Sequence, residues 1–146
     1  MKHTLAVLAA TLLLLASCNS EEKKIEKAAY GYLNATGNYL IDEAMPYASQ
    51  ETRERTLPFL KNTFIPMTDT NYIKANQPAT IVIDSVKVLC ADTATVDYTK
   101  TTPLKVLKGQ IHMVKEEGQW LAYVPLVLPA GISVPLPTEN NAPEAQ

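Results

Sequence analysis

The alternation of hydrophobic and polar positions divides the chain into a helical first half and a strand-rich second half. From residue 21 to residue 36, apolar side chains recur at i, i+4, i+7 and i+8, the spacing of one helix face. These positions are Ile25, Ala29, Tyr32 and Leu33. Asn19 or Ser20 is placed to cap the start of this helix, and Gly37 is placed to end it as the C′ residue.

Two further helices are expected before the strands begin. Asp42 is predicted to cap a short second helix and Ser49 a third, because both side chains can accept a backbone N–H bond. The third helix has its inward positions at Thr56, Leu57, Leu60 and Phe64. Pro58 lies inside it, and an interior proline costs about 3 kcal/mol, so the helix is expected to kink there or to begin late. Residues 61–78 are predicted to form a loop with a short strand around 71–74.

Four strands are predicted in the second half from period-two alternation and β-branched residues. They span residues 79–90, 93–101, 104–115 and 119–124. Glu116–Gly118 forms the last turn, in which Gly118 suits a positive φ. The last two strands are apolar on both faces, with Ile111, Met113, Leu121 and Tyr123 in one set and Val114, Trp120 and Val124 in the other. A shift of one residue exchanges these sets, so the pattern leaves the register open.

Helices followed by an antiparallel meander predict an α+β fold in which N-terminal helices pack on the sheet. Because the last two strands are apolar on both faces, the sheet is either covered in part on both sides or strongly curved. The length of 146 residues indicates one domain, with 47% hydrophobic and 19% charged residues as in ordinary globular proteins. The net charge of −2 provides no basic field, so no nucleic-acid partner is expected. Cys90 lies in an apolar strand and is predicted to be a small buried hydrophobic residue.

The first 17 residues are predicted to be a signal peptide. The apolar run Leu5–Ala16 is shorter than the roughly 20 residues that a membrane-spanning helix needs, and it suits the h-region of a leader. Leu15-Ala16-Ser17-Cys18 resembles a bacterial lipobox, which implies cleavage before Cys18 and attachment of lipid to its thiol. The alternative is a plain secretory signal with Cys18 as an ordinary thiol.

The residues after the cysteine bear on location. Asn19 differs from the aspartate that typically retains such lipoproteins at the inner membrane, so an outer-membrane lipoprotein is predicted. Residues 18–22 are expected to form a lipidated tether, although Ser20-Glu21-Glu22 also resembles an acidic signal for export to the cell surface. Residues 23–126 then form the α+β domain, and 127–146 a proline-rich tail that is partly disordered.

Several short segments carry a resemblance to a known family. They are Ala28, Tyr32 and Leu33, Gly37-Asn38-Tyr39, Ala94-Thr95-Val96, and the stretch Met113–Trp120 that ends in Gly118-Gln119-Trp120. In these the chain resembles the nuclear-transport-factor-2-like superfamily, also called cystatin-like or SnoaL-like. Within it the chain is similar to the lumazine-binding-domain-like bacterial lipoproteins of unknown function. The resemblance implies a cone-shaped, cystatin-like sheet wrapped around helices, and it implies no activity.

Enzymes on the fold that this resemblance implies act through side chains pointing into the cone. The candidate pocket residues here are Tyr32, Tyr98, Asp97, His112, Met113 and Trp120. No second carboxylate is spaced to pair with Asp97 or His112, and the chain has too few histidines and cysteines for a metal site. No glycine-rich phosphate loop is present either. The sequence therefore predicts no catalytic residue, no metal and no cofactor.

Three functions remain open on the sequence. The first is a lipid-anchored binding or accessory module, which holds a small apolar ligand or pairs with an envelope protein. The second is an isomerase or dehydratase that uses Asp97 or His112. The third is a structural envelope protein that forms a homodimer through its sheet. The lack of a catalytic set favours the first.

Overall fold

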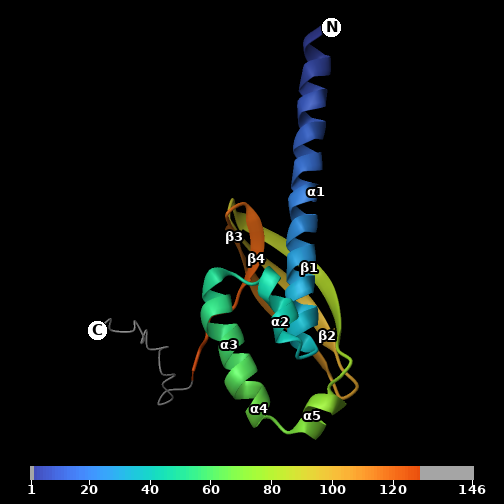
Figure 1. The fold of residues 1–146 in the computed structure, drawn as a ribbon. Helices are drawn as coiled ribbons and strands as arrows, with labels where there is room; N and C mark the ends of the chain where they lie inside the picture. The colour runs from blue at the N-terminus through green and yellow to red at the C-terminus, as the bar shows by residue number, and fades with distance from the viewer. Residues whose placement is uncertain (1, 129–146) are drawn as a thin grey trace, which may run out of the picture.

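The computed structural model describes residues 2–128, with side chains from Ser20 onward. Its helices come first and its strands second (Figure 1). The helical elements are α1 (Lys2–Gly37), α2 (Ile41–Ala44), η1 (Met45–Tyr47), η2 (Thr52–Thr56), α3 (Leu57–Phe59), η3 (Leu60–Phe64), α4 (Ile65–Met67) and α5 (Thr70–Ala75). The strands are β1 (Thr80–Cys90), β2 (Thr93–Thr101), β3 (Val106–Glu116) and β4 (Gln119–Tyr123). The predicted α+β class is confirmed.

Helix α1 differs from its prediction at both ends. Its backbone is helical through residues 18–22, so neither Asn19 nor Ser20 caps it. At the other end, the Leu40 N–H donates to the Ala35 carbonyl at 2.9 Å, and the Tyr39 N–H donates to the Thr36 carbonyl at 3.1 Å. These are the two bonds of a Schellman motif, whose left-handed residue is Tyr39 with φ 61°. Gly37 is therefore the last helical residue, and the predicted C′ position was wrong by two residues.

The backbone from Gln50 to Met67 is one helical run that passes through both of its prolines. Each proline follows directly on a π turn: the Leu57 N–H bonds the Thr52 carbonyl before Pro58, and the Ile65 N–H bonds the Leu60 carbonyl before Pro66. The wider turn accommodates the ring and the missing donor of the proline. A late start at Pro58 was therefore the wrong alternative.

The caps of the short helices agree with the sequence only in part. The Thr52 N–H donates to the Ser49 hydroxyl at 3.4 Å, so the predicted cap at Ser49 is confirmed. Asp42 instead lies in the first turn of α2, and no side chain caps that helix. The loop predicted for residues 61–78 is wrong, because η3 and α4 continue to Met67 and Asp69 caps α5.

The four strands form one antiparallel sheet in the order β1-β2-β3-β4, and their bounds agree with the prediction to within about two residues. Glu117 and Gly118 make a two-residue turn with φ of 49° and 78°. Met113 pairs with Ala122 and Lys115 with Trp120. Trp120 therefore shares a face with Met113, whereas the sets read from the sequence had separated them.

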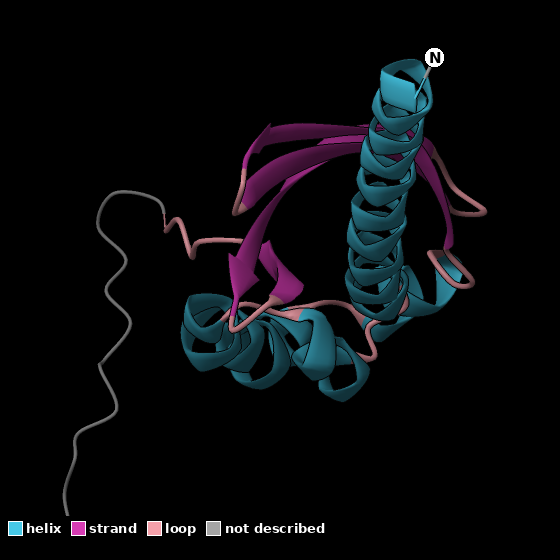
Figure 2. Ribbon diagram, turned by 90° about the horizontal axis from the view of Figure 1, so that it is seen from above, coloured by secondary structure: helices cyan, strands magenta, loops and turns pink. Residues whose placement is uncertain are grey.

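The sheet curves around α1, as the view from above shows (Figure 2). Its concave face carries Ala94, Val96, Ile111 and Met113, all buried, and α1 and Leu57 pack against them. The inside of the curve is thus filled by side chains. Among the residues whose side chains are described, no helix has the length and apolar character to cross a membrane. The predicted tail beyond residue 128 lies outside the described residues.

Candidate functional site

The six candidate pocket residues lie on two opposite faces of the sheet. Tyr32, Met113 and Trp120 are buried in the core, and Tyr98 is partly buried on the same concave face. Asp97 and His112 occupy the alternate positions of β2 and β3, so their exposed side chains point away from the core. The six residues therefore do not line one cavity.

Asp97 belongs to a ladder of polar side chains on the convex face. Its carboxylate accepts a hydrogen bond from Gln110 at 2.8 Å and one from Ser85 at 2.9 Å. These two bonds, Gln110 first, hold the pKa of Asp97 below its ordinary value. A general base or acid that works near neutral pH needs a carboxyl pKa raised toward 7, which is the opposite direction.

The two core tyrosines contribute packing. Burial, with a smaller contribution from Tyr98, raises the pKa of Tyr32 to about 12. Burial also raises the pKa of Tyr98 above its ordinary value. The Tyr98 ring covers the backbone of Gly109, where an added Cβ would stand 2.7 Å from the ring. Both phenols are therefore protonated at neutral pH and are held among apolar neighbours.

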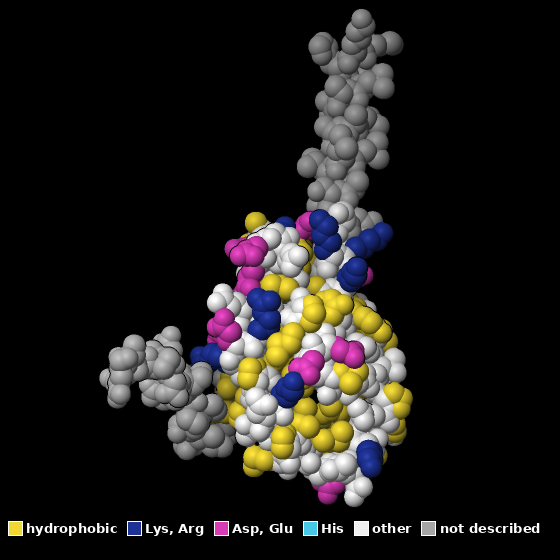
Figure 3. All heavy atoms as spheres, in the orientation of Figure 1, with side chains coloured by type: hydrophobic (Ala, Val, Ile, Leu, Met, Phe, Trp, Pro, Cys, Tyr) yellow, Lys and Arg dark blue, Asp and Glu magenta, His cyan; other side chains and the backbone are white. Residues whose placement is uncertain are grey.

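A pocket of about 330 Å³ opens at the end of the domain far from the N-terminus. We call it the mouth pocket, and its lining residues are Tyr39, Leu40, Ile41, Asp42, Glu43, Lys61 and Ile65. They come from the turn after α1, from α2 and from the helical run that ends at Met67. The space-filling view shows a hollow on this face, with apolar side chains around it (Figure 3).

The charged groups that line the mouth pocket are Lys61, Asp42 and Glu43, and Lys61 pairs with Asp42. The Lys61 ammonium lies 2.6 and 2.8 Å from the two carboxylate oxygens of Asp42, and both side chains are exposed. The apolar part of the lining consists of Leu40, Ile41 and Ile65, of which Leu40 is exposed. A hollow lined by apolar side chains with a few polar groups is typical of binding sites.

Tyr39 lines this pocket from a strained backbone. A bulky residue with positive φ is uncommon, and the left-handed region costs a non-glycine residue about 1–2 kcal/mol. The turn that holds it is fixed from both sides: the Ala79 N–H donates to the Asn38 side chain at 2.8 Å, and Gln77 donates to the Asn38 carbonyl at 2.6 Å. Burial, and then the neighbouring Tyr72, raise the pKa of Tyr39.

The opposite end of the domain is closed by a cluster that we call the latch, formed by Glu21, Lys24, Lys115 and Trp120. The Glu21 carboxylate accepts hydrogen bonds from Trp120 at 2.8 Å, Lys24 at 2.9 Å and Lys115 at 3.0 Å. The Lys115 ammonium also lies 5.6 Å from the centre of the Trp120 ring. These bonds, that of Trp120 first, lower the pKa of Glu21 from 4.5 to about 2. The latch ties the start of the domain to the last hairpin.

Sequence reasoning missed the mouth pocket. Its only signal was Gly37-Asn38-Tyr39, which stood out as a family resemblance and not as a lining segment. It also misplaced Cys90, which is exposed beside Asp92 and Thr93 at the end of β1. Among the described residues, no group of three or more histidine, cysteine, aspartate or glutamate side chains could hold a metal ion.

Comparisons with known proteins add little to this geometry. No protein-family model matches the chain, and no curated protein matches it. Among solved structures it is similar to an NTF-2-like protein of unknown function from Shewanella oneidensis, at 17% identity and a TM-score of 0.47. The similar region covers 68% of this chain and 92% of the other. A likeness of this strength assigns neither a family nor a function, so the α+β class rests on the observed topology.

Proposed function

We propose that this protein is a lipid-anchored binding module of the bacterial outer membrane, which holds a small apolar ligand in the mouth pocket without transforming it. We also propose that it is a relative of the nuclear-transport-factor-2-like superfamily, and within it of the lumazine-binding-domain-like lipoproteins. The binding role is argued first and the anchor second.

The mouth pocket carries the proposal for binding. It offers about 330 Å³ with an apolar lining of Leu40, Ile41 and Ile65, which suits a ligand of one or two rings. Tyr39 keeps a bulky ring in this pocket at the expense of backbone strain. Strain of this kind is retained where the side chain has a task beyond the fold, and contact with a ligand is such a task.

The surroundings of Asp97 and His112 support binding in preference to catalysis. Both side chains are exposed on the convex face, and Asp97 is engaged with Gln110 and Ser85. A reaction that uses them would have to take place on an open surface, where water competes for each group. The mouth pocket contains neither residue.

The short distance between Cys18 and the latch supports an anchor at that end. The side chain of Cys18 lies outside the described part of the chain. Glu21, only three residues later, is already bonded to Trp120 and Lys115. A lipid on Cys18 would therefore hold the latch end close to the membrane and leave the mouth pocket at the far end of the domain.

Ligand binding is tested with naphthalene-2-sulfonamide, a neutral two-ring probe, added to the full chain in lipid nanodiscs. Empty nanodiscs provide the blank. Binding measured by calorimetry should weaken markedly in Ile65→Asn, which places a polar side chain in the pocket lining, and should persist in His112→Gln. Equal binding by wild type, Ile65→Asn and the blank would refute the pocket as a ligand site.

Lipid attachment is tested by feeding cells an alkyne-tagged palmitate and detecting the tag on the purified protein. The wild-type chain should carry it, and Cys18→Ala should not. Cys90→Ala serves as the control, because that thiol is exposed and would report nonspecific acylation. Label that persists in Cys18→Ala would refute the anchor.

A further inference from the structure

We propose that the ligand of the mouth pocket is an amphipathic anion, whose apolar part enters the pocket and whose negative group is held by Lys100 and Lys105. This inference rests on the proposed binding function and names the class of ligand. Lys100 and Lys105 are called the lysine pair below.

The lysine pair carries positive charge that no carboxylate in the described part of the chain neutralises. Ion pairs among these residues join Lys24 and Lys115 to Glu21, and Lys61 to Asp42. Lys105 instead donates to the Tyr72 hydroxyl at 3.3 Å and lies 5.9 Å from the centre of that ring. Both cations are thus available to an anion from outside.

Lys100 stands on the concave face of the sheet, where its neighbours along β2 are core residues. It pairs across the strands with Ile81 and Leu107, two residue pairs beyond the pair of Tyr98 with Gly109. Its Cε packs over the end of α1, 3.6 Å from where a Cβ on Gly37 would lie. Partial burial and the nearby Lys105 lower the pKa of Lys100. A half-buried ammonium group loses hydration, and a second ammonium group nearby repels it. A bound anion would offset both effects.

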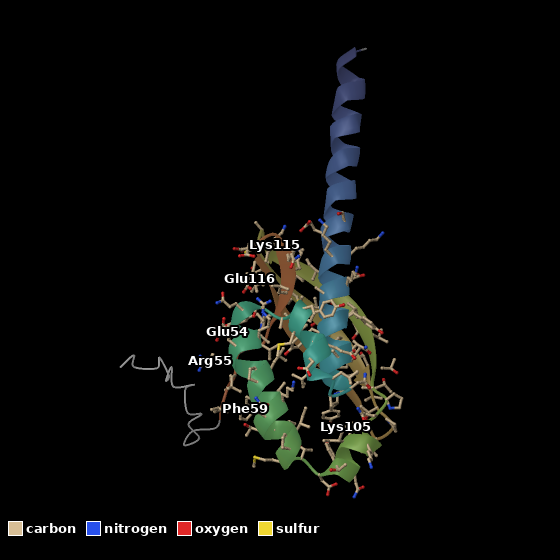
Figure 4. The ribbon with its side chains drawn as sticks, viewed as in Figure 1. Glu54, Arg55, Phe59, Lys105, Lys115 and Glu116 are labelled. Carbon is tan, nitrogen blue, oxygen red and sulfur yellow. The ribbon has the colours of Figure 1, made fainter. Side chains whose placement is uncertain are left out.

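Tyr39 connects the lysine pair to the mouth pocket. It lines the pocket, and Lys105 and Tyr72 lie near enough to influence the pKa of its phenol. It also follows Gly37, the residue under Lys100, by two positions. Figure 4 shows Lys105 at the α5 end of the sheet, far from Lys115 at the latch end. An apolar body in the pocket could therefore extend a charged group past Tyr39 to the lysine pair.

A structural role for Lys100 makes a different prediction. A cation near the last turn of a helix favours the helix dipole, and Lys100 lies beside the end of α1. In that case removal of its charge lowers stability and leaves ligand preference unchanged. If the lysine pair is an anion site, removal of its charge instead lowers the preference for an anionic ligand over a neutral one.

The experiment compares two probes of the same shape and different charge. Naphthalene-2-sulfonate is an anion, and naphthalene-2-sulfonamide is its neutral counterpart. The full chain in nanodiscs should bind the sulfonate about tenfold more tightly, because charge-assisted hydrogen bonds are the stronger ones. This preference should decrease with added salt. The double variant Lys100→Met, Lys105→Gln should bind both probes alike, with the sulfonamide affinity unchanged.

Matched variants keep the test interpretable. Lys108→Gln removes one positive charge from the opposite face of β3 and should retain the tenfold preference. Lys105→Gln alone changes an exposed side chain, so it reports on charge even if Lys100→Met impairs folding. A sulfonate preference that survives the double variant, or that is absent in wild type, overturns the anion site while sulfonamide binding keeps the pocket. If neither probe binds, the binding function itself fails.

Discussion

The two ends of the domain handle their charges in opposite ways. At the latch, Glu21 gathers two lysines and the indole of Trp120, so each cation of the cluster has an acid partner. At the mouth, Lys100 and Lys105 have none in the described chain, and Tyr39 holds a strained backbone. The charges of the latch are therefore balanced within the fold, without a ligand. The mouth leaves charge and apolar surface that a ligand could satisfy.

The comparison also separates stability from binding. Elements whose polar groups are paired and whose apolar side chains are buried contribute to folding. Regions that leave charged groups unpaired and apolar side chains exposed are available for recognition. Variants in the core or the latch should therefore change the free energy of unfolding, and variants at the mouth should change the affinity for a ligand. Four substitutions test this division, from the largest expected effect to the smallest.

Leu57→Ala should produce the largest loss of stability. Leu57 is fully buried in the core cluster that also contains residues of α1 and of the sheet, and such truncations cost about 2–5 kcal/mol. Met67→Ala, at the end of the helical run that contributes Lys61 and Ile65 to the mouth pocket, removes a side chain that is 82% exposed and should cost about 0.5 kcal/mol or less. Chemical denaturation of both variants measures the two values. Similar losses would show that the mouth is as tightly packed as the core.

Tyr39→Gly should separate stability from binding at a single position. Glycine adopts positive φ freely, so relief of strain should offset the lost ring and keep the free energy of unfolding within about 1 kcal/mol of wild type. The affinity for naphthalene-2-sulfonamide should nevertheless decrease several-fold. A large loss of stability with intact binding would instead assign Tyr39 to the fold.

Glu21→Gln should make the latch insensitive to acid. Because folding lowers the pKa of Glu21 from 4.5 to about 2, its carboxylate stabilises the fold above about pH 4.5. That contribution is lost as the pH falls from about 4.5 to about 2. The melting temperatures of wild type and variant should therefore differ at pH 7 and converge near pH 2.

Glu22→Gln is the control for the latch, because that exposed neighbour takes part in no ion pair of the described chain. Its melting temperature should follow wild type at every pH. A constant difference between wild type and Glu21→Gln across the pH range would remove the charge of the latch from the explanation.

His112→Gln should have the smallest effect. His112 is exposed on the convex face, so its replacement should change stability by about 0.5 kcal/mol or less and leave the affinity for both probes unchanged. Denaturation and calorimetry on one preparation provide both values. A clear loss of binding would return the convex face, and with it the enzyme hypothesis, to consideration.

Local chemistry determined much of the fold. Alternating residues and the Glu117-Gly118 turn set the four strands, because side-chain period and turn conformation are properties of neighbouring residues. The same reasoning identified the helix face of Ile25 and Ala29, both buried. It also found the cap at Ser49. Pro58 misled it, because a π turn adjusts the hydrogen bonds of a helix in a way that the proline alone does not reveal.

Only the tertiary structure decided the register of the last hairpin and the composition of the candidate site. Trp120 joins Met113 on the concave face, where its indole N–H donates to Glu21, 99 residues away in sequence. Lys105 likewise donates to the Tyr72 hydroxyl through the packing of two segments that are 33 residues apart in sequence. Such contacts depend on where whole elements dock. A periodic pattern gives the face on which a side chain lies, and docking alone gives what it meets there.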